Sequence, residues 1–482
     1  MNATPDELPA PAMYIGDSWI TAGKGRQSQP IVDPATGEGL GELPHATPDD
    51  INRALEQAQA AFLEWKKASP LERSAILRRA AQLIRDREDR IAMLLTREQG
   101  KPLMEARLEL RASADTIDWY AEEGRRAYGR IVPSRLAGQR QIVLRQPVGP
   151  AAAFAPWNFP ALTPTRKIAA SLAAGCSCII KPSEETPYTA IDLVRAFIDA
   201  GLPNGVLNLV FGIPSDISTQ LIASPIVRKV TFTGSVPVGK TLGRLAADHV
   251  KRATLELGGH APAIVFGDAD VEAATTTLAG AKYRNAGQIC IAPTRFYVED
   301  SVFDSFVDGF VKHASALRIG NGLHSETQMG PLANSRRVDA VSELINDAVG
   351  QGATLRTGGE RIGNTGHFFQ PTVLTDVPEG ARIMNEEPFG PVATINRFTK
   401  FDDVVESANR LPYGLAAYAF TGSNKTATAI GDEIESGMVG INNVMISVPE
   451  APFGGVKESG YGSESGTEGL DAFLNVKFIS QT

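Results

Sequence analysis

The sequence has few cysteines, no long apolar run and no excess of basic charge, and each shortage disfavours a class of protein. Three cysteines in 482 residues argue against a disulfide-stapled secreted domain, and we expect a reducing, cytoplasmic location. No apolar run is long enough to span a membrane. Residues 1–11 lack the basic and apolar regions of a targeting peptide. Acidic residues outnumber basic ones by 55 to 47, for a formal net charge of -8, which disfavours a nucleic-acid partner.

The G-x-G-x-x-G fingerprint of many dinucleotide-binding proteins is also missing, yet the order of elements predicts a fold of that kind. Two N-terminal helices are expected after the capping pairs Thr47-Pro48 and Ser69-Pro70. From residue 148 onward, short apolar stretches alternate with helical ones, which indicates βαβ units around a parallel sheet. We expect the strands of this sheet at residues 151–155, 177–181, 206–211, 229–232 and 253–257. A second α/β series follows from residue 261, with helices at 271–286, 302–316 and 402–411 and a strand at 372–375.

Two residues could carry chemistry on a carbonyl group. Cys290 ends the run Asn-Ala-Gly-Gln-Ile-Cys, and Glu256 precedes a Gly-Gly pair. A thiolate attacks an aldehyde readily, and a carboxylate shielded from water can take a proton from the thiol or from an attacking water. Each residue alone also has an ordinary explanation, because a lone Cys is often a core residue and a Glu at a strand end is often solvated. Asn158, set between aromatic residues, adds an amide that could stabilise an oxyanion.

Several motifs, in this order, make the chain resemble the aldehyde dehydrogenase superfamily. They span the sequence from about residue 15 to the C-terminus and comprise residues 156–160, 181–184, 232–239, 256–259, 285–290, 387–391 and 452–457. The resemblance implies an α/β fold of the aldehyde dehydrogenase type, with two Rossmann-like α/β domains and a small β element for oligomerisation.

The resemblance also implies a division of the chain. We expect a NAD-binding domain at residues 1–125 and 148–258, a catalytic domain at 259–458, and an oligomerisation element at 126–147 and 459–482. That element would include a hairpin at residues 129–146 and a C-terminal strand at residues 473–479, and it would assemble a homo-oligomer, either a dimer or a homotetramer.

The expected cofactor is NAD. Gly234 and Ser235 end a strand and open a helix, with Gly239 following, so backbone N–H groups and the helix dipole could hold a phosphate. Lys181 and Glu184 leave the second strand, where the adenosine ribose is expected. A carboxylate at Glu184 can accept a hydrogen bond from a ribose 2′-OH and would repel a 2′-phosphate, so we expect NAD in preference to NADP. The resemblance assigns four more residues to the cofactor site: Trp157, Leu257, Glu387 and Phe389.

The resemblance implies a catalytic cycle on Cys290, with Glu256, Asn158 and Lys181 as the other catalytic residues. The Cys290 thiolate attacks the aldehyde, the Asn158 amide stabilises the tetrahedral oxyanion, and loss of hydride leaves a thioester. Glu256 then activates the water that hydrolyses the thioester. A carboxylate at this position argues for hydrolysis over acyl transfer to coenzyme A or phosphate. No metal is expected. Many members of the superfamily have Lys or Asn at the position of His260, so we interpret His260 as a marker of one branch of the superfamily.

Two arginines indicate a substrate that carries its own negative charge. Arg166 and Arg284 match the carboxylate-binding positions of succinate semialdehyde dehydrogenases, and a guanidinium can grip a carboxylate with two N–H groups. Motifs at residues 123–126, 258–262 and 290–296 are also similar to 2-oxoglutarate semialdehyde (2,5-dioxopentanoate) dehydrogenases. We therefore expect NAD-dependent oxidation of one of these small-molecule semialdehydes to the dicarboxylic acid. Two alternatives stay open: a broad-specificity enzyme for uncharged aldehydes, and a catalytically silent binding protein that keeps the fold.

Overall fold

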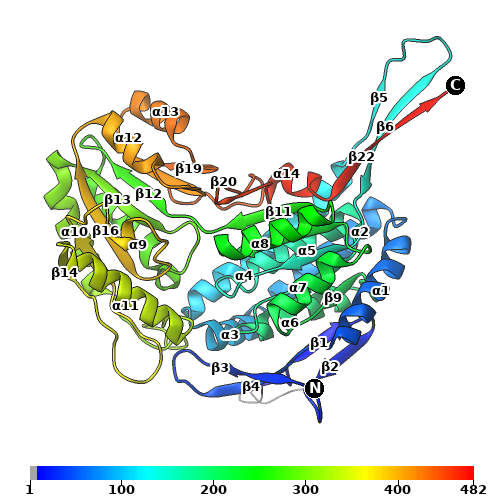
Figure 1. Cartoon of the computed structure of the whole chain (residues 1–482), viewed down its shortest axis with the longest axis horizontal. Helices are drawn as coiled ribbons and strands as arrows, with labels where there is room; N and C mark the ends of the chain where they lie inside the picture. The colour runs from blue at the N-terminus through cyan, green and yellow to red at the C-terminus, as the bar shows by residue number, and fades with distance from the viewer. Residues whose placement is uncertain (1–7) are drawn as a thin grey trace.

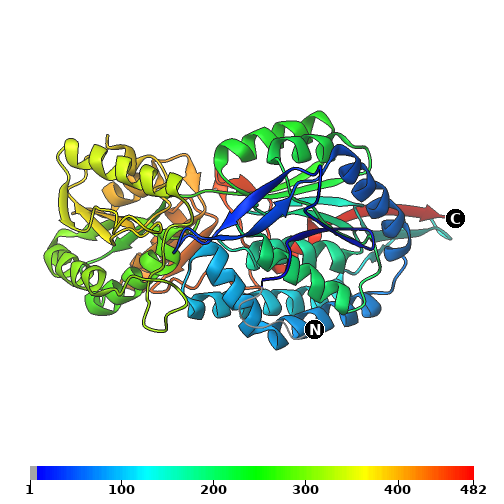
Figure 2. The same cartoon turned by 90° about the horizontal axis from the view of Figure 1, so that it is seen from below.

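The computed structural model describes residues 8–482, which form two α/β bodies side by side and a projecting β arm (Figure 1). An eight-stranded sheet lies in the first body, a seven-stranded sheet in the second, and a three-stranded sheet forms the arm. Figure 2 shows the two bodies from below, with helices packed around each sheet. The α/β fold class expected from the sequence is confirmed. Within residues 8–482, no helix combines the length and apolar character that crossing a bilayer requires.

The first sheet contains the five expected strands, all parallel to one another. They lie in the order β9 (Leu207–Leu209), β8 (Cys178–Lys181), β7 (Ala151–Phe154), β10 (Lys229–Gly234) and β11 (Arg252–Leu257). The chain runs from β7 through β8 to β9 on one side and returns to β10 on the other side of β7. Ligands of such sheets bind beyond the carboxyl ends of the strands at this switch point. Here those ends lead to Asn158 after β7 and to Ser235 after β10.

Segments that the sequence pattern did not predict as strands form the edges of the first sheet. β1 (Ala12–Ile15) and β2 (Ser18–Thr21) lie at one edge, and β21 (Gly460–Tyr461) pairs antiparallel with β11 at the other. Residues 460–461, which the expected division assigns to the oligomerisation element, therefore lie in the sheet of the first body. A separate ribbon joins β3 (Ser28–Val32) to β4 (Gly39–Pro44).

Helices cover both faces of the first sheet. They are α1 (Pro48–Trp65), α2 (Pro70–Asp86), α3 (Glu88–Gln99), α4 (Leu103–Glu123), α5 (Leu162–Ala174), α6 (Pro187–Asp199), α7 (Pro214–Ala223) and α8 (Val236–Asp248). The two expected helix starts are confirmed, because Thr47 and Ser69 each form a reciprocal capping box with the acidic residue three positions later. Alternate residues of β7 belong to different apolar clusters, Ala151 and Ala153 to one and Ala152 to the other. This sheet is therefore buried on both faces, as parallel sheets are.

The second body has a mostly parallel sheet in the order β14 (Thr354–Thr357), β15 (Thr372–Thr375), β16 (Val392–Phe398), β13 (Pro293–Glu299), β12 (Ala261–Val265), β18 (Ala416–Phe420) and β19 (Met438–Ile441). Its helices are α9 (Val271–Tyr283), α10 (Phe303–Ala316), α11 (Ser335–Gly350), α12 (Phe401–Asn409) and α13 (Asn424–Glu433). The chain also has smaller elements. Two of them, the 3-10 turn η1 (Gly124–Arg126) and the helix α14 (Gly466–Asp471), pack against helices of the first body. The others are β17 (Tyr413–Gly414), β20 (Val456–Lys457) and the 3-10 turns η2 (Arg284–Gly287), η3 (Asp300–Val302) and η4 (Arg382–Met384).

The expected helix at residues 271–286 ends earlier than the sequence pattern suggests. Helix α9 stops at Tyr283, because Asn285 and Ala286 have positive φ values of 49° and 52°. Non-glycine residues rarely adopt this left-handed conformation, which cannot continue a right-handed helix. The chain therefore leaves the helix axis just before Cys290.

The arm consists of β5 (Arg130–Val132), β6 (Arg140–Pro147) and β22 (Leu474–Gln481), paired antiparallel. The expected hairpin near residues 129–146 and the C-terminal strand near 473–479 are thus both present, and they pair with each other. Apolar side chains on the arm are exposed, including Ile131, Val476 and Phe478.

Candidate active site

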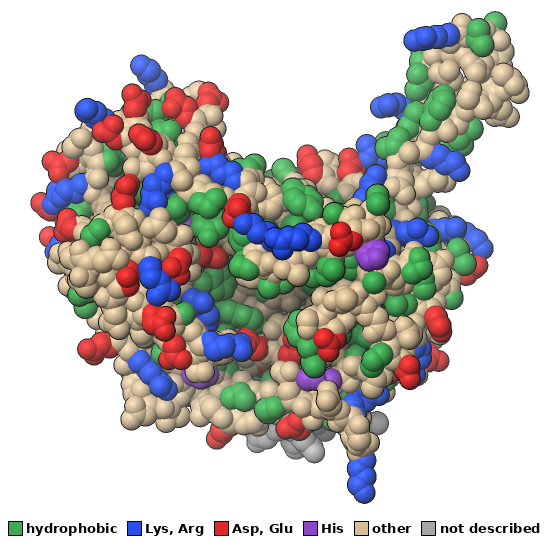
Figure 3. All heavy atoms as spheres, viewed as in Figure 1, with side chains coloured by type: hydrophobic (Ala, Val, Ile, Leu, Met, Phe, Trp, Pro, Cys, Tyr) green, Lys and Arg blue, Asp and Glu red, His purple; other side chains and the backbone are tan. Residues whose placement is uncertain are grey.

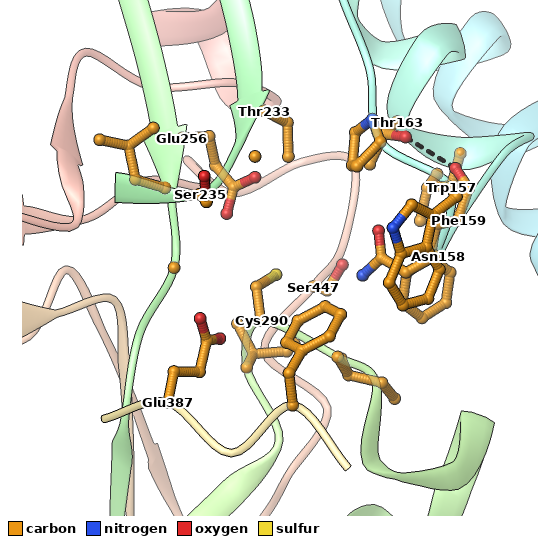
Figure 4. A pocket seen from close by; sticks show the side chains of 18 of the residues that line it. Trp157, Asn158, Phe159, Thr163, Thr233, Ser235, Glu256, Cys290, Glu387 and Ser447 are labelled. Carbon is orange, nitrogen blue, oxygen red and sulfur yellow. Dashed lines mark hydrogen bonds between the residues drawn. The ribbon is translucent and has the colours of Figure 1, made fainter. Parts of the chain in front are cut away.

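A cavity of about 470 Å³ lies between the two bodies and brings together most of the expected site residues. Figure 3 shows the surface hollowed at this junction. The turn after β7, the ends of β10 and β11, the loop before β13 and the segment before β16 all contribute to its walls. Figure 4 shows Cys290 among Glu256, Glu387 and Asn158.

Cys290 lies on a strained loop that leads from α9 to β13. Asn285, Ala286 and Gly287 all have positive φ values, and such residues persist only where their surroundings hold them. A Cβ at Gly287 would lie 2.1 Å from the carbonyl oxygen of Gly390, so this position requires glycine. Removal from water and the nearby carboxyls of Glu256 and Glu387 raise the pKa of the Cys290 thiol well above its ordinary value.

Glu256 lies near the end of β11 with its carboxyl group in the cavity. The residue is 2% exposed, and its Oε1 has no hydrogen-bond partner within residues 8–482. Burial, with a contribution from Glu464, raises the pKa of Glu256 to about 7, while Lys167 and Arg166 oppose the rise. A carboxyl that titrates near neutral pH is suited to act as a general base.

Asn158 follows β7 and is 4% exposed. Its Nδ2 donates to the main-chain oxygen of Gln288 at 3.1 Å, which leaves its second N–H free of that bond. Its own main-chain oxygen accepts hydrogen bonds from Lys101 and Asn285. The amide therefore stands beside the Cys290 loop, as an oxyanion donor would need to.

The phosphate end of a dinucleotide fits the start of α8. Ser235 is the N-cap of this helix, but its side chain makes no capping hydrogen bond, so the first-turn N–H groups are available to an anion. Gly239 packs below Leu257, and a Cβ there would lie 2.3 Å from Leu257 Cδ2. Gly234, Ser235 and Leu257 line the cavity, which matches the expected cofactor path.

Lys181 and Glu184 lie at the carboxyl end of β8, outside the lining of the cavity that holds Cys290. The Lys181 Nζ pairs with Glu184 Oε1 at 2.5 Å, and the Gly212 N–H donates to the same oxygen at 3.2 Å. This place suits the adenosine ribose. Lys181 does not line the cavity that holds Cys290, and its ammonium pairs with Glu184; the catalytic role expected for Lys181 stays a prediction.

The segment before β16 supplies another wall of the cavity, where the sequence predicts the nicotinamide end of the cofactor. Glu387 accepts the Gly259 N–H at 3.4 Å, and burial raises its pKa to about 8. Phe389, at a positive φ of 41°, packs edge-on against Trp157 with ring centroids 5.5 Å apart. Arg337, which the motifs did not reveal, donates to the Pro388 oxygen at 2.5 Å and so holds this segment.

Arg166 and Arg284 both line the cavity. Arg166 is 5% exposed and lies on α5, where its Nη2 donates to Ser447 Oγ at 2.6 Å. Its guanidinium lies 4.1 Å from the Phe453 ring centroid, and its Nε has no hydrogen-bond partner within residues 8–482. Arg284 is exposed and lies 5.7 Å from the Phe159 ring. Within the same residues, neither guanidinium has a carboxylate oxygen within 4.0 Å.

Sequence reasoning missed a buried polar network behind Glu256. The Lys167 Nζ donates to Thr233 Oγ1 at 2.7 Å and forms an ion pair with Glu464. Lys167 carries no motif beyond its place next to Arg166, and Glu464 is remote in sequence, so no local pattern joins them. His260, expected to mark a branch, is buried, and its two ring nitrogens contact Thr294 Oγ1 and the Ile383 oxygen.

The family model described as the Aldehyde dehydrogenase family matches residues 19–479. The chain belongs to the aldehyde dehydrogenase family. This match confirms the resemblance seen in the motifs and makes the cavity between the bodies the candidate active site of an aldehyde dehydrogenase.

This aldehyde dehydrogenase is similar to characterised relatives over nearly its whole length. It is 50% identical to 4-(hydroxymethyl)benzenesulfonate dehydrogenase TsaD1 of Comamonas testosteroni, with 97% of this chain and 98% of the relative covered. It is 42% identical to the succinate-semialdehyde dehydrogenase (NADP(+)) GabD of Escherichia coli K12, with 96% of each covered. A crystal structure of succinate-semialdehyde dehydrogenase from Burkholderia pseudomallei superposes with a TM-score of 0.95 at 43% identity, covering 98% of this chain and 97% of that one.

Proposed function

We propose that this aldehyde dehydrogenase oxidises a short aldehyde that carries an anionic group, with NAD in preference to NADP, and hydrolyses the acyl intermediate to the acid. Succinate semialdehyde and 2-oxoglutarate semialdehyde are the substrates that the sequence favours. The 50% identical relative is by name a dehydrogenase of 4-(hydroxymethyl)benzenesulfonate, an aryl sulfonate alcohol, and we add the corresponding aldehyde to the proposed substrates. The observation that carries the proposal is the pair of guanidinium groups in the cavity, Arg166 and Arg284, neither of which is bound to a carboxylate in the part of the chain that the structure describes.

In this proposal Cys290 is the nucleophile. Glu256 accepts the thiol proton as the sulfur adds to the aldehyde carbon, and the Asn158 N–H and the Cys290 backbone N–H donate to the new oxyanion. Bound NAD supplies the acceptor for the hydride that leaves the tetrahedral carbon. The bond between sulfur and carbon remains, and the product on Cys290 is a thioester.

The second half of the reaction depends on Glu256. Glu256 first gives the thiol proton to solvent. With a pKa raised to about 7, its carboxylate form is well populated at neutral pH and can then take a proton from a water that attacks the thioester carbon. The C–S bond breaks, the acid leaves, and the proton passes to the sulfur or to solvent. The Lys167–Glu464 pair lies behind Glu256, where Glu464 raises the pKa of the Glu256 carboxyl and Lys167 lowers it.

The preference for NAD rests on Glu184. A ribose 2′-OH could donate to this carboxylate, whereas a 2′-phosphate would meet its negative charge at the carboxyl end of β8. Lys181, already paired with Glu184 at 2.5 Å, would donate to the ribose hydroxyls. The Escherichia coli relative is by name NADP-dependent, so a comparison of its residue at this position with Glu184 bears directly on the proposed preference.

The recognition of an anion rests on donors around the cavity mouth. Arg166 has two nitrogens beyond the one that contacts Ser447, and Arg284 is exposed and lines the cavity. Charge-assisted hydrogen bonds from arginine to a carboxylate or a sulfonate are worth about 1.5–3 kcal/mol each. The surrounding Phe159 and Phe453 rings limit competing water.

We also include in the proposal a homo-oligomer that uses the arm, and a reducing compartment. The exposed apolar side chains of β5 and β22 support the first. The three free cysteines support the second.

A matched substrate panel tests the function. We expect NADH production from succinate semialdehyde, 2-oxoglutarate semialdehyde and 4-formylbenzenesulfonate, with kcat/KM at least ~10²-fold above that of hexanal or benzaldehyde. Arg166→Ala should lower kcat/KM for the charged aldehydes by ~10–10²-fold and for the neutral ones far less. Comparable values for charged and neutral aldehydes would favour the broad-specificity alternative, and no NADH from any aldehyde would restore the silent binding protein.

A further inference from the structure

A buried lysine holds the turn that carries Asn158. Lys101 is 1% exposed, and its Nζ donates to the main-chain oxygen of Asn158 at 2.8 Å while lying 4.1 Å from the Phe159 ring centroid. Its counter-charge is Glu109, at 2.6 Å and equally buried. A buried ammonium costs several kcal/mol unless it is paired and fully hydrogen-bonded, so an apolar side chain would fill this space at lower cost. We therefore look for the role of this ion pair in the groups that it contacts.

Glu109 holds the other end of the same turn. Its Oε1 accepts the N–H of Ala161 at 2.7 Å and of Leu162 at 3.1 Å, at the start of α5. The Lys101–Glu109 pair thus fixes the turn at the carbonyl of Asn158 and at two amides just beyond it. The Asn158 side chain, between these points, has little freedom to shift.

Gln99 connects this arrangement to the loop of the nucleophile. Its Oε1 accepts the Lys101 N–H at 3.0 Å, and its Nε2 donates to Asn285 Oδ1 at 2.9 Å. Asn285 in turn donates through Nδ2 to the Asn158 oxygen at 3.0 Å. Asn285 is one of the left-handed residues before Cys290, and a conformation of that kind costs about 1–3 kcal/mol unless its surroundings enforce it.

The segment from Gln99 to Lys101 cannot move aside, because it packs backbone to backbone against the second body. A Cβ at Gly330 would lie 2.0 Å from the Gly100 oxygen, and a Cβ at Gly322 would lie 2.5 Å from the Lys101 oxygen. The segment therefore spans the boundary between the bodies and touches both the Asn158 turn and the Cys290 loop.

We infer that Gln99, Lys101 and Glu109 form a clamp that sets the position of the Asn158 amide relative to the Cys290 sulfur. They are positioning residues, since none of them lines the cavity. The inference rests on the proposed role of Asn158 as an oxyanion donor. An error of about 1 Å in such a contact can cost roughly 10²-fold in rate, so the clamp acts on kcat and not on the binding of substrate or cofactor.

The test is a mutant cycle with Asn158. The paired variant Lys101→Met/Glu109→Gln removes both buried charges and keeps an acceptor for the Ala161 and Leu162 amides. We expect it to lower kcat by roughly 10²-fold, with KM and the NADH dissociation constant, measured by fluorescence, changed by less than about 3-fold. In an Asn158→Ala background the same substitutions should lower kcat by less than about 3-fold, because the amide that they position is gone.

Lys229→Met is the matched control. Lys229 is a lysine of equal burial in the first body, bonded to Thr254 Oγ1 and remote from the clamp, so its effect should multiply with that of Asn158→Ala. If the paired variant lowers kcat by the same factor with and without Asn158, or leaves kcat unchanged, the clamp is refuted while the role of Asn158 stands. If Asn158→Ala alone leaves kcat unchanged, the oxyanion role itself is refuted, and the clamp with it. Should the paired variant not fold, Gln99→Leu, which keeps the buried charges balanced, carries the same comparison.

Discussion

Replacing Glu256 with Gln should stabilise this protein, and the gain should grow with pH. Burial raises the pKa of Glu256 from its ordinary 4.5 to about 7. Between these two values the folded chain keeps the proton and the unfolded chain releases it. The unfolded state therefore becomes more favourable as the pH rises, and stability falls over this window. Above pH 7 both states are ionised, and the loss is complete.

The size of this effect follows from the two pKa values. The difference between 4.5 and about 7, at about 1.4 kcal/mol for each tenfold change in proton affinity, corresponds to about 3 kcal/mol. The destabilisation is about 1 kcal/mol at pH 5 and about 3 kcal/mol at pH 8. With an unfolding entropy of about 2.1 cal/mol/K per residue over 482 residues, 3 kcal/mol corresponds to about 3 °C in the thermal midpoint.

Differential scanning fluorimetry from pH 4.5 to 8.5 measures this directly. Glu256→Gln should match the parent protein near pH 4.5 and exceed its midpoint by about 3 °C at pH 8. Glu406→Gln, at an exposed glutamate on α12, is the control and should show a difference that does not vary with pH. A Glu256→Gln midpoint that tracks the parent at every pH, or falls below it as the pH rises, would refute the raised pKa and with it the argument for Glu256 as a neutral-pH base.

Three further substitutions test individual roles. Cys290→Ala should abolish turnover and leave the NADH dissociation constant, measured by fluorescence, within about 3-fold of the parent; loss of NADH binding would contradict a purely nucleophilic role. Glu256→Gln should form its first NADH more slowly, because Gln cannot take the thiol proton, and should then stall after one NADH per active site, without the rise in rate that the parent shows as the pH passes 7 and Glu256 loses its proton; steady turnover at the parent rate would remove Glu256 from both steps. Glu184→Ser should raise kcat/KM with NADP relative to NAD by ~10-fold or more, because it removes the charge that opposes a 2′-phosphate, and an unchanged ratio would place the ribose elsewhere.

The parallel strands and helix starts were predictable because local chemistry decides them. A parallel strand that is buried on both faces is usually a nearly continuous apolar run, as in β7 from Ala151 to Phe154. A helix start needs an acceptor for its free N–H groups, which Thr47 provides. The antiparallel edge strand β21 was not predictable, because its pairing with β11 depends on the tertiary arrangement and its two residues carry no alternation. The early end of α9 at Tyr283 could not be predicted for a similar reason, since the left-handed Asn285 is held by hydrogen bonds from α3, α4 and the turn after β7.

Site residues that lie in short sequence motifs could be predicted. Site residues whose contacts come from segments far apart in the chain could not. Cys290, Glu256, Asn158 and Glu387 each lie in a short distinctive run, and the structure brings all four to one cavity. The sequence predicts that Lys181 lies near the cofactor, but it cannot reveal that the Lys181 ammonium pairs with Glu184. Lys101 and Glu464 carry no motif, and their contacts join segments far apart in the chain.

Arg166 has two electrostatic tasks that the substrate brings into conflict. In the ligand-free protein it lowers the pKa of both the Glu256 carboxyl and the Cys290 thiol, against the effect of burial. A carboxylate or sulfonate bound to Arg166 offsets its charge, so Glu256 has a higher pKa with an anionic aldehyde in place than with a neutral one. The acidic limb of the pH profile for kcat should accordingly lie at higher pH for succinate semialdehyde than for hexanal. Arg166→Ala should bring the two limbs together, whereas a role in anion binding alone would change KM and leave both limbs in place.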